Sequence, residues 1–229
     1  IFVTDHSAKI ISSIEPKNGE EPMKPRKIVA HNGKIYAGTV DGYLLRIDTI
    51  SYTIEDKIKT SPYPEDLLIY GNTLFVANSG YGYQNEVGYD NTVSAINLST
   101  FKEDKKIELP AYNPVRLKKD NQGNIYELCW EIWQKTKSSL YKLNPSTYAV
   151  TKIADGGVGI EMVLSGDKLL IMKLDYEADA TTFSYYNTKK GELINQSFIT
   201  DGTIIEKGNS LTVDPVTENI YVGTGDYLT

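Results

Sequence analysis

Several residue types that build enzyme sites are scarce in this sequence. Its only cysteine, Cys129, permits no internal disulfide and no cysteine-based zinc site. With only His6 and His31 as imidazoles, neither a multi-histidine metal centre nor a serine-type triad is expected. No apolar run approaches the ~18 residues of a membrane-spanning helix. These absences favour a protein that is not an enzyme, and the sequence predicts neither a cofactor nor a metal site.

Positive charge is also in short supply. The 24 Lys and Arg residues face 30 Asp and Glu residues, which gives a net charge of −6. A chain of this sign is not expected to bind nucleic acid or an anionic membrane surface. The sequence opens on "IFVTD", which already reads as part of a strand. We therefore expect the natural N-terminus to lie upstream, where an export signal and a lipid anchor have room.

Tyrosine, in contrast, is abundant, with 17 residues. Three of them fall within "NSGYGYQNEVGYDNTV", residues 78–93, between two segments that alternate as half-buried strands do. Two such strands need only a two-residue turn. The extra length and the aromatic content of this connection therefore require another explanation.

A repeat organises the chain. Five segments begin with Pro or Gly, have an apolar residue three positions later, and have a large apolar residue eight to ten positions after that. The segments start at Pro25, Pro64, Pro114, Gly159 and Gly208. The first apolar column is Ile28, Leu67, Leu117, Met162 and Leu211, and the second is Tyr36, Phe75, Tyr126, Leu170 and Tyr221.

Each complete unit continues with two further strands. The first of these ends at Asp48, Asn97, Asn144 or Asn187, and a polar strand such as "TIEDKIKT" follows. Four short strands, A to D, recurring every ~40–50 residues predict an all-β fold, a β-propeller of four-stranded blades. A β-sandwich does not require the same apolar columns in every unit. About five blades' worth is present in one domain, 1–229, which we expect to be part of a seven-bladed chain. Blades start near 25, 64, 114 and 159, with incomplete units over 1–24 and from 208.

The units "YPEDLLIYGNTLFVANSG" and "NPVRLKKDNQGNIYEL" resemble those of YncE-like, or YVTN-repeat, propellers. They are also similar to exported propeller lipoproteins of gut Gram-negative bacteria that carry the labels "surface layer" or "domain of unknown function". The resemblance implies a location at the outer-membrane surface or in the periplasm. Its relatives include cobalamin-capturing surface proteins, propellers credited with DNA binding, and lyases of antibiotic lactones. Such motifs specify the fold strongly and the function weakly.

Propeller geometry predicts which connections share a face. Strands alternate in direction, so D–A and B–C connections lie at one end of the blades, while A–B and C–D turns lie at the other. Three consecutive B–C connections are expected to be long: 78–91, 129–139 and 173–182. They place on one face Tyr81, Tyr83, Tyr89, Trp130, Trp133 and Tyr176. These rings either form a wall for a ligand or partner, or cover blade edges and pair across strands.

The same face carries the beginnings of the A strands, which are rich in charge. The residue before each apolar position is Lys27, Asp66, Arg116, Glu161 or Ser210, and Arg26 and Glu65 stand one residue earlier. One of these two rows is expected to face the central channel. The alternatives are a charged mouth that suits a polar small molecule, or a solvated ring whose charges neutralise one another.

These features favour a non-enzymatic binding propeller that captures a small molecule or a partner protein on the B–C face. Cobalamin is a ligand that the resemblance implies, and a glycan is a ligand that Tyr and Trp rings can bind on a flat surface. The alternative is an enzyme of the lyase or lactonase kind at the channel mouth, with Glu161, Asp66 or Glu65 as acid or base. Such chemistry usually requires a metal or a histidine among convergent carboxylates.

Overall fold

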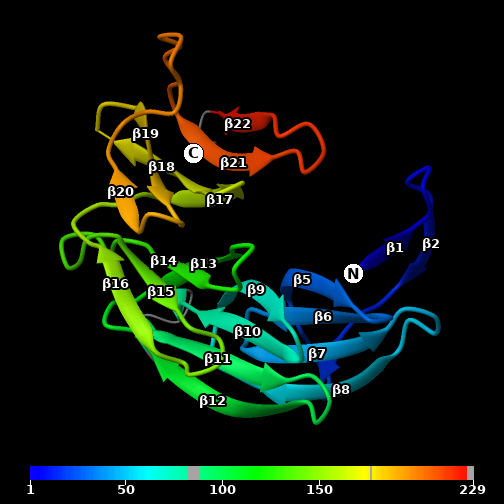
Figure 1. Ribbon diagram of the computed structural model, residues 1–229. Helices are drawn as coiled ribbons and strands as arrows, with labels where there is room; N and C mark the ends of the chain where they lie inside the picture. Colours follow the sequence, from blue (N-terminus) through cyan, green and yellow to red (C-terminus); the bar gives the residue numbers. More distant parts are fainter. Residues whose placement is uncertain (82–87, 176, 226–229) are drawn as a thin grey trace. The chain divides into compact units, whose positions relative to one another are not determined.

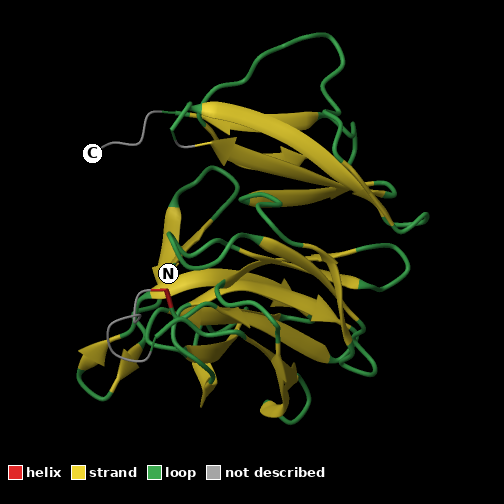
Figure 2. Ribbon diagram, turned by 90° about the vertical axis from the view of Figure 1, so that its left-hand side faces the viewer, coloured by secondary structure: helices red, strands yellow, loops and turns green. Residues whose placement is uncertain are grey.

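The computed structural model describes residues 1–81, 88–175 and 177–225. The chain divides into two compact units, Ile1–Val115 and Arg116–Thr229. No α-helix occurs in the described ranges, where strands and loops dominate and a single 3₁₀ turn lies at Tyr81 (Figure 2).

The first unit contains two four-stranded antiparallel sheets and two short hairpins (Figure 1). In each large sheet the strands follow chain order, and each strand pairs antiparallel with the next one along the chain. The hairpins are β1 (Phe2–Thr4) with β2 (Ile10–Ser13), and β3 (Lys17–Asn18) with β4 (Glu21–Pro22). The first large sheet is β5 (Pro25–His31), β6 (Lys34–Thr39), β7 (Tyr43–Asp48) and β8 (Ile54–Lys59). The second is β9 (Pro64–Tyr70), β10 (Thr73–Asn78), β11 (Thr92–Asn97) and β12 (Lys102–Glu108).

The second unit begins within β13 and repeats this pattern. One sheet is β13 (Pro114–Lys119), β14 (Ile125–Cys129), β15 (Ser139–Leu143) and β16 (Val150–Ala154). The next is β17 (Glu161–Ser165), β18 (Lys168–Asp175), β19 (Ala180–Asn187) and β20 (Glu192–Ile194). A two-stranded sheet follows, formed by β21 (Gly208–Val213) and β22 (Ile220–Thr224).

Neighbouring sheets of one unit pack face to face through apolar side chains. In the first unit, Tyr36 and Leu44 of one sheet pack with Leu74, Val76 and Ile96 of the next. The rings of Tyr36 and Phe101 lie 6.1 Å apart between their centroids. Because both sheets bury one apolar face in this contact, the hydrophobic effect holds them together.

The second unit uses the same arrangement. The ring centroids of Tyr126, on β14, and Tyr186, on β19, lie 5.7 Å apart. Leu170 and Met172 of β18 form a cluster with Leu211 of β21. Each sheet of this unit therefore packs against the one that follows it along the chain.

Cys129 is fully buried at the end of β14. Burial first, and then the nearby carboxylate of Glu127, raise the pKa of its thiol well above the ordinary value. Because the thiolate is the reactive form, we expect no reaction of the native protein with an aromatic disulfide reagent at pH 8. One equivalent should react once the protein is unfolded in guanidinium chloride. A fast stoichiometric reaction without denaturant contradicts the burial of this residue.

Candidate functional site

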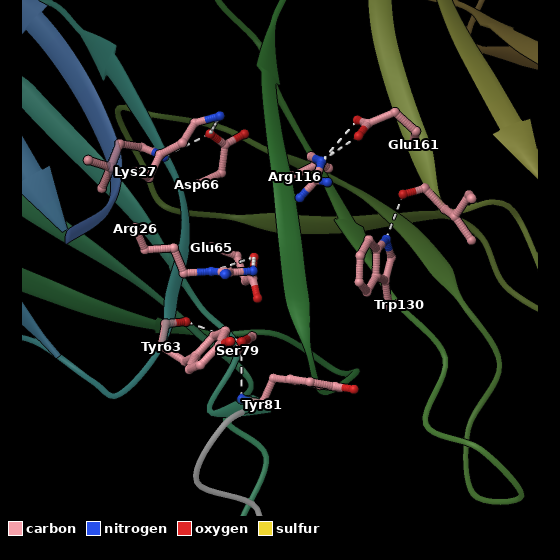
Figure 3. Close-up of polar contacts among 12 residues, drawn as sticks. Arg26, Lys27, Tyr63, Glu65, Asp66, Ser79, Tyr81, Arg116, Trp130 and Glu161 are labelled. Atoms are coloured by element: carbon pink, nitrogen blue, oxygen red, sulfur yellow. Dashed lines mark hydrogen bonds and ion pairs between the residues drawn. The ribbon is translucent and has the colours of Figure 1, made fainter. Parts of the chain in front are cut away.

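The charged side chains at the start of the A strands form ion pairs between neighbouring strands of the first unit. Arg26 donates to Glu65 from both Nε and Nη2, at 3.1 and 2.6 Å (Figure 3). The ammonium of Lys27 lies 3.2 Å from Oδ1 of Asp66. The carboxylates are nearly buried, with 4% and 5% of their side chains exposed, while Arg26 and Lys27 are 35% and 44% exposed. The charges therefore neutralise each other in two ion pairs. Each pair joins a residue of β5 to the residue at the equivalent position of β9.

A row of tyrosine rings extends from Arg26. Its guanidinium carbon lies 4.4 Å from the centroid of the Tyr63 ring, a cation–π distance. The rings of Tyr63 and Tyr81 are 6.0 Å apart, and those of Tyr81 and Tyr89 are also 6.0 Å apart. Burial, followed by the neighbouring Tyr81, raises the pKa of the Tyr89 hydroxyl above its ordinary value. Tyr81 remains 46% exposed. In this row, Tyr63 and Tyr89 are therefore half-buried, while Tyr81 is accessible.

Backbone hydrogen bonds hold the base of this loop against the D–A connection that carries Tyr63. The amide and the hydroxyl of Ser79 each donate to the Tyr63 carbonyl at 3.1 Å, and the hydroxyl accepts from the Tyr81 amide at 3.1 Å (Figure 3). Gly80 takes φ +65°, and a Cβ there would lie 2.7 Å from the amide nitrogen of Asp90. Only glycine fits this close approach without displacing the chain. The positions of Tyr81 and Tyr89 are thus set by the loop's own backbone.

Tyr63 is a site residue that sequence reasoning missed. It lies in the short connection between β8 and β9, whereas the predicted rings all belong to the B–C loops. D–A and B–C connections share one end of the blades, so the tyrosine in "SPYPED" was a usable signal. Of the other predicted rings, Tyr83 and Tyr176 lie outside the described residues.

The second unit combines an ion pair with an aromatic ring in a similar way. Nε of Arg116, on β13, donates to both oxygens of Glu161, on β17, at 2.9 and 2.7 Å. The guanidinium carbon lies 5.3 Å from the centroid of the Trp130 ring. Trp130 in turn donates its indole N–H to the carbonyl of Ile160 at 2.6 Å (Figure 3). Trp130 is therefore only partly accessible, and its contacts connect β13 with the start of β17.

Trp133 is placed differently, at the tip of the B–C connection. A pair of backbone hydrogen bonds between Ile132 and Thr136, both 3.0 Å, closes a tight hairpin that presents this indole. The ring is 67% exposed and lines a hollow of about 300 Å³ formed by residues 131–137. Trp133 is thus available to a ligand, while Trp130 is engaged within the fold.

The third B–C connection is short, contrary to the expectation of a long loop over 173–182. The strands β18 and β19 continue to pair until Asp175 meets Ala180. The alternation of side chains persists through these residues, which allows the ladder to extend. Residues expected in a loop, among them Lys173 and Thr182, therefore lie within the sheet.

Among the residues that the structure describes, no group of three or more His, Cys, Asp or Glu side chains is placed to hold a metal ion. In the same ranges, no helix has the length and apolar character needed to cross a membrane.

Comparisons with solved structures identify the fold class as a β-propeller. The WD40 domain of Neurospora crassa Pan2 is similar with a TM-score of 0.68 and 10% identity, over 97% of this chain and 66% of that one. Kuenenia stuttgartiensis hydrazine synthase gives 0.67 and 15% identity, over 86% of this chain and 55% of that one. The computationally designed Ika4 protein gives 0.52 and 9% identity, over 71% of this chain and 90% of that one.

At these identities the likeness shows the fold alone. The chain spans 55% and 66% of the two natural structures. No protein-family model and no curated protein sequence matches it. The prediction of an all-β propeller built from four-stranded blades, with about five blades' worth in this chain, is confirmed.

Proposed function

We propose that this chain is a non-enzymatic binding propeller whose B–C face captures a small molecule or a partner protein. The observation that carries the proposal is the row of Tyr63, Tyr81 and Tyr89, anchored at one end by Arg26 and accessible at Tyr81. Such rings offer a large contact area at little cost in conformational entropy. The connection of β10 to β11 does not require such a row of rings, so its exposure favours a binding role.

The charges beside these rings favour a ligand with little net charge. The two ion pairs at the A strands of the first unit each join one cation to one carboxylate, so the surroundings of the row are polar without an excess of either sign. Flat, polar molecules such as a corrinoid or a glycan fit this combination. The deficit of positive charge, −6 over the chain, argues against a nucleic-acid strand, which needs cations beside its stacked bases.

The finer assignment follows the sequence resemblance to YncE-like propellers and to exported propeller lipoproteins. On that basis we assign the protein to the outer-membrane surface or the periplasm, where a lipid anchor would hold it. Protease accessibility of the protein on intact cells, compared with lysed cells, tests the surface location.

The enzymatic alternative assigns acid–base roles to Glu161, Asp66 or Glu65. Each of these carboxylates already contacts a cationic side chain, at 2.7, 3.2 and 2.6 Å respectively. A carboxylate held in this way contributes to the joining of blades and is less available to a substrate. Stabilisation of the protein by a divalent metal, together with turnover of a lactone, supports the enzyme instead.

The binding proposal predicts separate effects of ring removal on affinity and on stability. A thermal-shift screen with corrinoids, oligosaccharides and divalent metals identifies the ligand. Tyr81→Ala should then weaken the binding of a ligand held at the tyrosine row, and Trp133→Ala the binding of a ligand held at the hollow of residues 131–137. Each loss should be about 1–3 kcal/mol by calorimetry, because stacked rings contribute on that scale. The melting temperature should change little, since the two rings are 46% and 67% exposed.

The matched control is Ile50→Ala, which removes a side chain 88% exposed in the turn between β7 and β8, at the opposite end of the sheet. It should change neither quantity. A large loss of stability in the tyrosine or tryptophan variant shows instead that the rings pack within the blades.

A further inference from the structure

A second concave surface lies within the second unit, and none of the rings and ion pairs described above line it. It is a groove of about 310 Å³ between two adjacent blades. One wall is the segment 154–158, which connects β16 to the next blade, and the other wall comes from β18, β19 and β20. Its polar lining includes Lys173, Thr182, Ser184 and Asn195.

Sheet register explains why three of these side chains, Lys173, Thr182 and Ser184, gather. Lys173 pairs with Thr182 across β18 and β19, so both side chains project from the same face. Ser184 follows two residues after Thr182 and shares that face, since side chains alternate along a strand. Phe183, between them, projects to the opposite face and joins the cluster of Leu170 and Met172. The polar groups are therefore held by a packed sheet.

All four polar groups are available to a ligand. Among the described residues, the ammonium of Lys173 makes no ion pair, and the side chains of Thr182, Ser184 and Asn195 make no hydrogen bond. Asp155, at the rim, is already paired with Lys152 at 2.7 Å. The groove thus carries one uncompensated positive charge in a chain whose net charge is −6.

The opposite wall is fixed in place and leaves space for the ammonium. The amides of Gly157 and Val158 donate to the carbonyl of Ser138 at 3.1 and 3.4 Å, and the Gly159 amide donates to its hydroxyl at 3.1 Å. Gly157 has φ +97°, and a Cβ there would lie 3.3 Å from Nζ of Lys173. Glycine at this position therefore leaves room for the ammonium, which a side chain would crowd.

We propose that this groove binds a small hydroxylated carboxylate, of which an acidic monosaccharide is the simplest example. Lys173 pairs with the carboxylate, and Ser184, Thr182 and Asn195 exchange hydrogen bonds with the hydroxyl groups. The volume of about 310 Å³ lies at the lower end of the range for small-molecule pockets. This site does not depend on the aromatic B–C face, and either proposal can fail without the other.

Titration of the protein with glucuronate, followed by calorimetry and by amide shifts in NMR spectra, tests the site. Binding should be saturable and weaken as sodium chloride is raised, because the contact to Lys173 is partly exposed. Glucose, which lacks the carboxylate, should bind at least about tenfold more weakly, as should glucuronate to Lys173→Gln, since charge-assisted hydrogen bonds contribute on this scale. Ser184→Ala should reduce the affinity severalfold.

The control is Lys190→Gln, which removes another exposed lysine of the same blade, in the turn before β20. It should bind glucuronate as the unchanged protein does. Equal affinity for glucuronate in Lys173→Gln, or equal affinity for glucose and glucuronate, overturns the proposal. Weak, non-saturating shifts spread over many lysines also overturn it.

Discussion

Replacement of Phe75 by alanine should destabilise the protein by about 3–5 kcal/mol, the usual cost of truncating a buried aromatic side chain. Phe75 is fully buried on β10, and it occupies the second apolar column of the repeat. Its loss leaves a cavity that the surrounding side chains cannot fill without moving. The free energy of unfolding in urea measures the effect.

The repeat supplies a matched control for this substitution. Tyr221 occupies the same column in the last unit, but 53% of it is exposed. Tyr221→Ala should therefore cost less than about 1 kcal/mol. Similar losses in the two variants show that column membership, and not burial, determines the effect, which contradicts the packing described here.

Substitution of Asp120 should produce the second large effect. This residue is 4% exposed in the turn between β13 and β14. Its carboxylate accepts hydrogen bonds from the Tyr126 hydroxyl and the Asn124 side chain, both at 2.8 Å, and from the amides of Gln122 and Asn124, both at 2.9 Å. Asp120→Ala leaves these donors without their acceptor, and we expect a loss of about 2–4 kcal/mol. Urea unfolding monitored by tryptophan fluorescence measures it.

The same residue predicts a dependence of stability on pH. Burial alone raises the pKa of Asp120, but hydrogen bonds from Asn124, Tyr126 and two backbone amides outweigh it and hold the pKa below the ordinary value. A carboxyl with a lowered pKa in the folded state stabilises the protein above its unfolded pKa, about 3.9, and this stability is lost as the pH falls through the folded value. Asp120→Asn, which does not titrate, should therefore lose less stability than the unchanged protein between pH 5 and pH 2.5. Equal losses indicate that other carboxyls control the acid transition.

The sequence by itself determined the strands, the turns and most of the core. Alternating apolar residues specify strands locally, and the recurrence of two apolar columns shows that successive units fold alike. The buried Tyr36, Phe75 and Tyr126 were identified in this way. The charged residues at the A strands were also visible, because register along a strand follows from the hydrophobic pattern.

Only the tertiary structure decided which of these residues meet. Arg26 contacts Glu65 and Arg116 contacts Glu161 across sequence separations of 39 and 45 residues, and no local pattern specifies such a pair. The sequence also did not determine which tryptophan is exposed. Trp130 is hydrogen-bonded within the fold while Trp133 projects from a hairpin, although both occur in the connection between β14 and β15. The Lys173 groove lies between a connection of one blade and three strands of the next. Contacts of this kind depend on how one sheet stacks on another, which is set by the summed packing of whole faces and by no single segment.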